Sequence, residues 1–347
     1  MITRGQAQAL DAEDVLSQFR DAFELEDGLI YLDGNSLGPL PKATEPRLAA
    51  AVTEEWGRDL ITSWNKHGWM FLPQRVGEKI APLVGAADGQ VVAADSTSIN
   101  LFKVLAAAVQ MNPGRRKILS EPGNFPTDLY MVQGLQELLG ANRCELVLAE
   151  EDEIVEAIDE ETALVMLTHV NFRSGRMHDM AAITRVAQAK GALMCWDLAH
   201  SAGAVPVELD ACNADFAVGC GYKYLNGGPG APAFLYVARR HQARVVQPLS
   251  GWHGHATPFT FDVDYVPAGS VDRYLCGTPS VLAMIALEES LDLWAQADMA
   301  AVRRKSVALC DMFIQLVEER CAGHGFKLAS PRKADRRGSQ VSFAHAE

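Results

Sequence analysis

The chain has 347 residues, of which 48% are hydrophobic and 22% are charged, and its formal net charge is -13. This length predicts about two domains with a full core, and the acidic balance argues against a nucleic-acid or anionic-membrane surface. The seven cysteines form no CxxC pair, so neither a disulfide framework nor a zinc site is expected. Because the sequence shows no signal core and no apolar run of ~18 residues, we expect a soluble protein of the reducing cytoplasm.

The N-terminal part predicts two helical stretches with a short strand between them. Helical spacing covers residues 5–25 and 43–67. The second stretch carries apolar side chains at four-residue steps, namely Leu48, Val52, Trp56, Leu60 and Trp64. Residues 29–41 read as a short strand that runs into a loop rich in turn residues.

From residue 90 to residue 240, short apolar runs alternate with helical stretches. The runs are 116–120, 144–149, 163–168, 192–197, 216–220 and 233–238, and the helices expected between them include 97–110, 127–139 and 180–190. This alternation predicts an α/β fold with a mostly parallel sheet covered on both faces. The last two runs are joined by a glycine-rich loop, which favours one antiparallel edge. Residues 279–297 and 300–322 are expected as long helices, with a strand-like segment after Gly325.

Three polar elements follow predicted strands or open a predicted helix. Asp197 ends one strand and His200 follows it, Lys223 lies between two tyrosines before a glycine-rich loop, and residues 95–100 carry serine and threonine at the start of an apolar helix. Each has an ordinary interpretation: a helix-capping aspartate, a surface lysine, and a plain N-cap. The functional interpretation of the third is a phosphate held at a helix N-terminus.

Taken together, the three elements fit pyridoxal 5'-phosphate (PLP). That cofactor needs a lysine amine for an imine, a carboxylate that keeps the pyridine nitrogen protonated, and a helix N-terminus for its phosphate. Ligands of such sheets lie beyond the carboxyl ends of the strands. Asp197 precedes Lys223 by 26 residues with one strand pattern between them, which places both at neighbouring strand ends.

Four longer motifs carry a family resemblance. They are Phe125-Pro-Thr-Asp128, Asp197-Leu-Ala-His-Ser-Ala-Gly203, Tyr222-Lys-Tyr-Leu-Asn-Gly-Gly-Pro-Gly230 and Gly251-Trp-His-Gly254. With them the chain resembles the kynureninases, fold-type-I PLP enzymes of the aminotransferase class V group, from Tyr31 to Phe343. The Asp, His and Lys spacing alone would also suit cysteine desulfurases.

The resemblance implies an architecture and an activity. Residues 1–60 would contribute to a small domain, residues 61–300 would form the large PLP-binding domain, and residues 301–347 would begin the C-terminal small domain. The activity would be hydrolysis of L-kynurenine to anthranilate and L-alanine, within tryptophan catabolism and NAD biosynthesis. The enzyme would be a cytoplasmic homodimer whose active sites are shared across the interface.

The resemblance also implies roles for single residues. Lys223 would hold PLP as a Schiff base and move protons, Asp197 would pair with the pyridine nitrogen, and Tyr222 would relay a proton. Phe125 would stack on the ring, with plain core packing as its alternative. The remaining cofactor contacts implied are Thr97 and Ser98 on the phosphate, Asp128, Thr168 and His200 nearby, and Trp252 and Thr278 reaching the partner subunit's phosphate.

Substrate-side and metal predictions complete the site. Ser36, Trp64 and His253 are the substrate candidates, although Trp64 also fits the helix stripe as a core residue. Thr278 can be read as a helix start and His200 as a structural histidine. His253 and His255 lie two apart with no carboxylate ligand pattern nearby, so no metal is expected.

Other functions stay open at this point. A cysteine desulfurase-like or aminotransferase-like PLP enzyme is the main alternative, but a desulfurase needs a mobile nucleophilic cysteine, and most cysteines here lie in apolar runs. A PLP-fold binding protein would not need both Lys223 and Asp197. Family members continue into a C-terminal subdomain whose Arg holds the substrate carboxylate. Glu347 precedes any such Arg, so these 347 residues, if they were the whole protein, would be expected to bind PLP but to hydrolyse kynurenine poorly.

Overall fold

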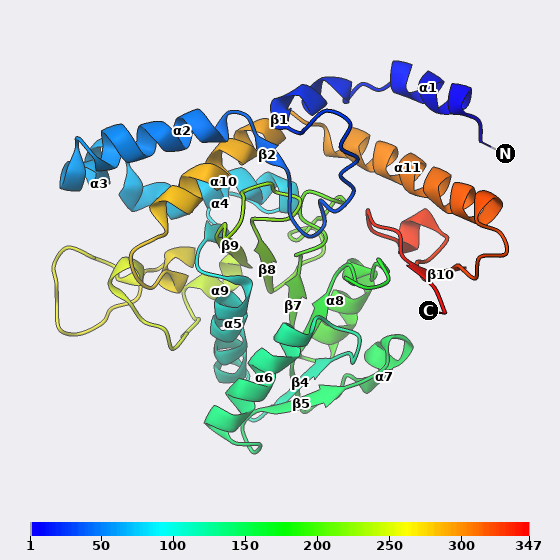
Figure 1. Ribbon diagram of the computed structural model, residues 1–347. Helices are drawn as coiled ribbons and strands as arrows, with labels where there is room; N and C mark the ends of the chain where they lie inside the picture. The colour runs from blue at the N-terminus through cyan, green and yellow to red at the C-terminus, as the bar shows by residue number, and fades with distance from the viewer. Residues whose placement is uncertain (1, 347) are drawn as a thin grey trace.

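The computed structural model describes residues 2–346, and its centre is a seven-stranded sheet (Figure 1). The strand order is β3-β9-β8-β7-β6-β4-β5. The neighbours from β8 to β5 pair in parallel, whereas β9 is antiparallel to both β8 and β3. The strands are β3 (Val91–Ala93), β4 (Lys117–Ser120), β5 (Glu145–Leu148), β6 (Thr162–Thr168), β7 (Leu193–Asp197), β8 (Phe216–Cys220) and β9 (Ala233–Val237).

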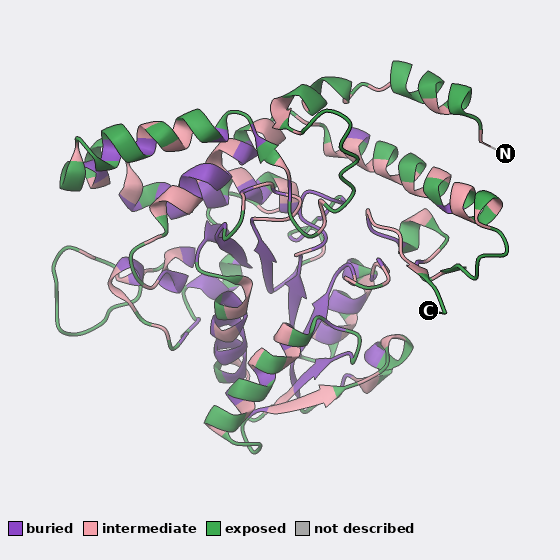
Figure 2. Cartoon of the chain, viewed as in Figure 1, coloured by how far each residue is buried: buried purple, intermediate pink, exposed green. Residues whose placement is uncertain are grey.

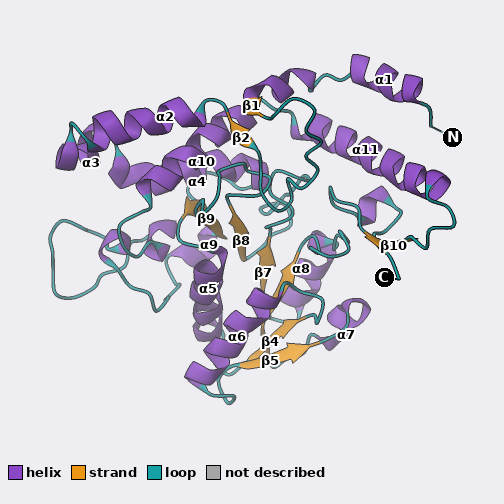
Figure 3. Ribbon diagram, in the orientation of Figure 1, coloured by secondary structure: helices purple, strands orange, loops and turns teal. Residues whose placement is uncertain are grey.

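The predicted α/β fold is therefore confirmed, together with its antiparallel edge (Figure 3). All six expected strands form within two residues of their predicted bounds. The sequence reading missed β3, because three residues are too short a run to show a period.

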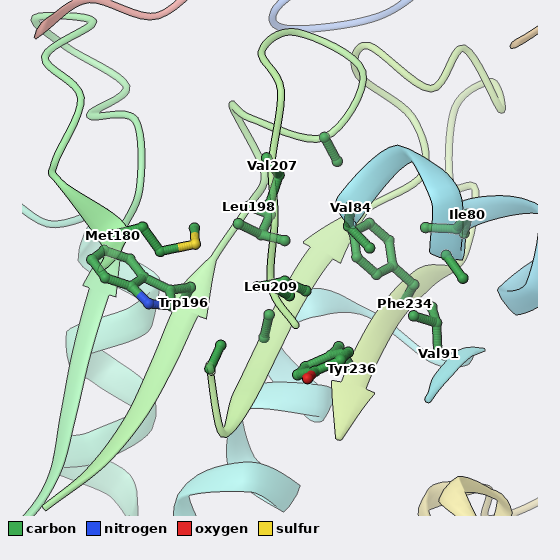
Figure 4. Packing of buried hydrophobic residues seen from close by; sticks show 14 of the residues in the cluster. Ile80, Val84, Val91, Met180, Trp196, Leu198, Val207, Leu209, Phe234 and Tyr236 are labelled. Carbon is green, nitrogen blue, oxygen red and sulfur yellow. The ribbon is translucent and has the colours of Figure 1, made fainter. Parts of the chain in front are cut away.

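Alternate residues of the strands feed two separate cores. In β6, Leu164 and Met166 pack with α5 (Thr97–Met111) and α6 (Pro126–Leu139). Val165 and Leu167 point the other way, into a core shared with α4 (Leu72–Ile80), α8 (Met180–Ala189) and α10 (Val281–Trp294). Figure 4 shows part of this second core, where Trp196, Leu198 and Phe234 are buried. Both faces of the sheet are thus covered, as a parallel sheet requires.

The expected long helices are also confirmed, including α11 (Met299–Arg320). Their starts follow local chemistry: Ser96 accepts a hydrogen bond from the Ile99 backbone N–H at the start of α5, and Pro126 stands in the first turn of α6. The shorter helices are α1 (Arg4–Ala12), α2 (Thr44–Ala50), α3 (Ser63–Lys66), α7 (Ile154–Ala157) and α9 (Arg239–Gln242).

Three N-terminal expectations were wrong. The helix predicted over 5–25 ends as α1 at Ala12, and after a turn at 13–16 only a 3₁₀ helix, Ser17–Ala22, follows. The predicted helix over 43–67 is interrupted after α2 by a π-helical stretch, Ala51–Trp56, and by a turn in which Leu60 has φ +51°. Leu48 of its apolar stripe packs against the core, but Trp56 and Leu60 are 57% and 59% exposed. The stretch from α2 to α3 is accordingly coloured largely as exposed in Figure 2. No strand forms at 29–32 either, because this run lies against no sheet edge; instead Tyr31 anchors the loop by donating to the Leu37 carbonyl at 2.7 Å.

A small two-stranded sheet follows α11 near the C-terminus. Its strands are β10 (Lys327–Leu328) and β11 (Phe343–Ala344), which confirms the strand-like segment after Gly325. A second pair, β1 (Phe23–Glu24) and β2 (Leu40–Pro41), forms near the N-terminus. The domain bounds at 60 and 300 stay a prediction. Over residues 2–346, no helix combines the length and the apolar character that crossing a membrane would need.

Candidate active site

A cavity of about 270 Å³ opens at the carboxyl ends of β6, β7 and β8, beside the first turns of α5 and α6. Nine predicted cofactor residues line it: Thr97, Ser98, Phe125, Asp128, Thr168, Asp197, His200, Tyr222 and Lys223. Ser96, Thr127, Phe172, Ala199 and Cys220 complete the lining. Residues separated by more than 120 positions in the sequence therefore meet at one edge of the sheet, where such folds bind ligands.

Asp197 is the last residue of β7 and is 3% exposed. Its carboxylate accepts hydrogen bonds from the Ala199 backbone N–H at 2.8 Å and from the Thr168 hydroxyl at 3.3 Å. Burial raises the pKa of Asp197, and these two hydrogen bonds together with the charge of Lys223 do not offset it. The carboxylate is therefore short of cationic partners within the described chain.

Asp128 faces the same space from the first turn of α6. Its Oδ2 atom is buried, and no described group donates a hydrogen bond to it. Burial and the negative charge of Asp197 raise the pKa of Asp128 well above its usual range. Two buried carboxyls side by side favour a ligand that brings positive charge or an N–H donor.

Lys223 lies three residues beyond β8, the strand that pairs with β7. Its Nζ atom is 2.9 Å from Nε2 of His200 and 5.9 Å from the centre of the Phe125 ring. Burial, followed by the charge of Lys223, lowers the pKa of His200 to about 4. Burial raises the pKa of Tyr222, so its phenol is protonated at neutral pH.

The Phe125 ring is 41% exposed, so it does not belong to the core. It meets the Phe172 ring edge to face at a centroid distance of 5.2 Å. Asn124 fixes the start of this segment, because its side-chain oxygen accepts from the Phe125 backbone N–H at 2.7 Å and shares the one hydroxyl proton of Thr168 with Asp197. The flat face of Phe125 is thus held at the cavity wall.

The opposite end of the cavity is the N-terminus of α5, with Ser96, Thr97 and Ser98. Asp95, just before it, has φ +46° and bonds at 2.5 Å to the fully buried Nζ of Lys103. Lys103 also donates to the Tyr274 carbonyl at 2.5 Å, which ties the turn to the interior. The first-turn N–H groups and hydroxyls form a site suited to an anionic group.

The groups that line the cavity fit PLP. An under-partnered carboxyl pair, an amine, an aromatic face and a helix N-terminus are the donors and acceptors that a phosphorylated pyridinium aldehyde requires. Among residues 2–346 no cluster of three metal-ligating side chains occurs.

Comparison with known proteins decides the family. The sequence profile of aminotransferase class V matches residues 72–347. A kynureninase from Pseudomonas fluorescens is 52% identical over 351 aligned positions, which cover 100% of this chain and 84% of the relative. A kynureninase from Burkholderia pseudomallei (strain 1106a) is 52% identical over 349 positions, covering 99% and 84%. The chain belongs to the kynureninase family, within aminotransferase class V.

Solved structures support the same fold at lower identity. The apo cysteine desulfurase from Thermococcus onnurineus NA1 aligns with a TM-score of 0.78 at 22% identity, over 95% of this chain and 82% of that one. The cysteine desulfurase CsdA from Escherichia coli gives 0.78 at 21% identity, over 95% and 82%. At these identities the likeness shows the fold alone.

Five predicted residues of this kynureninase-family chain lie outside the cavity. Trp252 is 5.9 Å from Trp64 between ring centres and stacks on His253 at 4.9 Å, so these three form one aromatic cluster. His253 is buried and donates from Nε2 to the Met70 carbonyl at 2.9 Å. Thr278 is exposed, and Ser36 donates to Asp33 at 2.8 Å. The cofactor and substrate roles of these five stay predictions.

Sequence reasoning missed three residues that shape the kynureninase-family site. Asn124 precedes the quoted Phe125 motif by one position, so that motif could have found it. Phe172 follows β6 in an irregular loop, where no period marks it. Gln340 contacts His200 from a segment 140 residues away, and only the family resemblance through Phe343 pointed to that region.

Proposed function

We propose that this chain hydrolyses L-kynurenine to anthranilate and L-alanine with PLP as its cofactor. One observation carries the proposal: in a chain 52% identical to kynureninases, Lys223 shares a cavity with the buried, under-partnered pair Asp197 and Asp128. When bound, PLP supplies an electron sink that amino-acid side chains lack.

The cavity residues divide the task of holding the cofactor. Asp197 keeps a proton on the pyridine nitrogen, and this cation in turn stabilises the buried carboxylate. Thr97, Ser98 and the first-turn N–H groups of α5 hold the phosphate. Phe125 packs its ring against the cofactor ring, a contact worth roughly 0.5–1.5 kcal/mol beyond burial.

Proton movement falls to Lys223 and its neighbours. The Lys223 amine attaches the cofactor and takes the α-proton of the substrate, and His200 lies within hydrogen-bond distance of that amine. Tyr222 keeps its phenol proton at neutral pH and donates it to the carbon that becomes the alanine methyl group. Water supplies one oxygen of the anthranilate carboxyl group and the ketone of kynurenine supplies the other, so the overall reaction is a hydrolysis.

Exposed apolar side chains support a homodimer with shared active sites. Five large apolar side chains are more than half exposed, as expected of a surface that a partner covers: Trp56, Ile61, Phe71, Phe259 and Phe261. Trp252 lies beside this surface, because its ring is 6.2 Å from that of Phe259 and it lines one pocket with Phe261. We assign Trp252 and Thr278 to the partner's phosphate, and Ser36, Trp64 and His253 to the substrate side.

The seven free thiols suit a reducing compartment, and we place the enzyme in the cytoplasm, in tryptophan catabolism. The test of the activity measures anthranilate fluorescence after kynurenine is added to the PLP-loaded protein, and sulfide after L-cysteine is added. We expect anthranilate and a shift of the visible cofactor band with kynurenine. Sulfide without anthranilate would reject the proposal in favour of a desulfurase-like enzyme.

Sedimentation measurements test the dimer separately. A Trp56→Glu, Phe71→Glu variant places charge on the exposed apolar surface, whereas Leu309→Glu changes an exposed apolar residue on α11. We expect the first variant to be monomeric and the second to remain dimeric. A wild-type protein that sediments as a monomer when loaded with PLP would overturn the shared site.

A further inference from the structure

Three side chains form a hydrogen-bonded line that ends on Lys223. The Lys223 Nζ atom lies 2.9 Å from His200 Nε2, and His200 Nδ1 lies 3.0 Å from Gln340 Oε1. Gln340 Nε2 then donates to the Phe172 carbonyl at 2.7 Å. Lys223, His200 and Phe172 line the cavity, while Gln340 reaches it from the segment before β11.

The far end of this line sets the direction of each hydrogen bond. A carbonyl oxygen only accepts, so the amide nitrogen of Gln340 must face Phe172 and its amide oxygen must face His200. That oxygen also only accepts, so Nδ1 of His200 carries a proton. In the neutral ring Nε2 then has a free lone pair and accepts from Lys223. Because burial and Lys223 lower the pKa of His200 to about 4, the ring is neutral at neutral pH.

The backbone around Gln340 is held firmly enough to support this role. The Gly338 N–H donates to the Gly175 carbonyl at 2.8 Å, and the Met177 N–H donates to the Arg336 carbonyl at 2.9 Å. Gly175 has φ +69°, and a Cβ there would come within 2.9 Å of Gln340 Cγ. A glycine is therefore needed for the two segments to approach.

We propose that Gln340 is a positioning residue that fixes the Nδ1–H tautomer of His200 and so makes Nε2 the acceptor for a proton of Lys223. The inference rests on the proposed function, because the free Lys223 amine is the form that attaches the cofactor and takes the substrate proton. With the opposite tautomer, an N–H would point at Lys223 and occupy the lone pair that the free amine needs to attach the cofactor. The tautomer therefore decides whether Nε2 of His200 accepts a hydrogen bond from Lys223 or donates one to it.

The first test uses the cofactor-free protein and nitrogen NMR of labelled histidine, which distinguishes the two tautomers and the cation. The variants are Gln340→Met, which removes the acceptor, and Gln340→Glu, which places a carboxylate beside Nδ1. Ser339→Ala is the matched control, because it loses a hydrogen bond to the Ala204 carbonyl in the same segment without touching His200. We expect the Nδ1–H tautomer in wild type and control, a tautomer mixture in Gln340→Met, and the imidazolium in Gln340→Glu.

The second readout is the rate at which added PLP attaches to Lys223, followed by visible absorbance. Loss of one hydrogen bond should slow attachment by up to about tenfold in both Gln340 variants and not in Ser339→Ala. An unchanged Nδ1–H tautomer in Gln340→Met, or unchanged attachment in both variants, would overturn the proposal. If the tautomer shifts as expected but kynurenine is not hydrolysed, the substrate assignment fails and the role of Gln340 stands.

Discussion

Asp197 ends β7 and Asp215 immediately precedes the neighbouring strand β8; the two are almost equally buried, at 3% and 2% exposure, yet their surroundings differ. Asp215 lies just before β8, at the amino end of the strands. It accepts from His241 Nε2 at 2.7 Å, Arg240 at 2.6 Å, Gln188 at 3.0 Å and the Met194 N–H at 2.9 Å. Burial alone would raise its pKa, but its hydrogen bonds to His241 and Gln188 and the charge of Arg240 outweigh burial, and the pKa is lowered.

Asp197, at the carboxyl end, has two neutral donors, and burial raises its pKa. The comparison shows that residue type and burial do not separate a structural aspartate from a functional one. The number and charge of its partners do, because a buried carboxylate left short of donors stores an unfavourable free energy that a cationic ligand can relieve.

Lys223→Ala is the most direct test of the predicted site at the carboxyl ends of the strands. If this amine attaches the cofactor and moves the substrate proton, as we propose, its loss should lower kcat by roughly a thousandfold or more. The circular dichroism spectrum should match wild type, since Lys223 supports no packed core. A variant that kept near-normal turnover and a cofactor absorbance band would place the attachment on another lysine.

Asp197→Asn should cost activity without costing stability. A neutral amide cannot hold the pyridine proton, and loss of a charged hydrogen bond worth ~1.5–3 kcal/mol corresponds to about 10–100-fold in kcat. In the cofactor-free protein, urea unfolding should show equal or greater stability, because a buried charge is removed. Unchanged kcat would refute the assignment of Asp197 to the cofactor ring.

Asp215→Asn should show the opposite pattern. The variant leaves His241 and Arg240 without their carboxylate, which should lower the free energy of unfolding by roughly 3 kcal/mol. Once folded and loaded with PLP, it should hydrolyse kynurenine at close to the wild-type rate. A large fall in kcat with normal stability would show that the two ends of the sheet are not functionally distinct.

The contrast between the two aspartates also shows which parts of the fold and site could be predicted from the sequence. The strands that carry Asp197 and Asp215 are continuous apolar runs, so the sheet, its helices and the neighbouring strand ends were predictable. Local patterns could also place Lys223, Asp197 and the start of α5 together.

What could not be predicted depends on contacts distant in sequence. Nothing near Asp215 in the sequence announces His241, and nothing near His200 announces Gln340. The stripe through Trp56 was misread because an exposed apolar face and a core face have the same helical period. The number of hydrogen-bond partners, which distinguishes Asp215 from Asp197, is set by the folded structure and not by the local sequence.

The pH dependence of the free energy of unfolding should show that His200, in the cavity at the carboxyl ends of the strands, is buried as a neutral ring. Its pKa falls from 6.5 to about 4 on folding, so the unfolded chain binds the proton more tightly. The neutral ring therefore contributes stability that is present above pH 6.5 and is lost as pH falls toward 4, by about 3 kcal/mol. In urea titrations of the cofactor-free protein, the free energy of unfolding of His200→Gln should fall by that much less than the wild-type value between pH 6.5 and pH 4. Parallel curves for the two proteins would mean that His200 is not buried as a neutral ring.

Cys220→Ala should have the smallest effect, although Cys220 lines the same cavity as Lys223. Burial raises the pKa of this thiol to about 11, so hardly any nucleophilic thiolate exists at neutral pH. Anthranilate release should stay within about twofold of wild type, a change of under half a kcal/mol in the barrier. Cys144→Ala is the matched control, because that thiol is also buried with a pKa of about 11 but lies outside the cavity. A folded, PLP-loaded Cys220→Ala protein that lost activity while Cys144→Ala kept it would make the thiol catalytic and favour desulfurase-like chemistry.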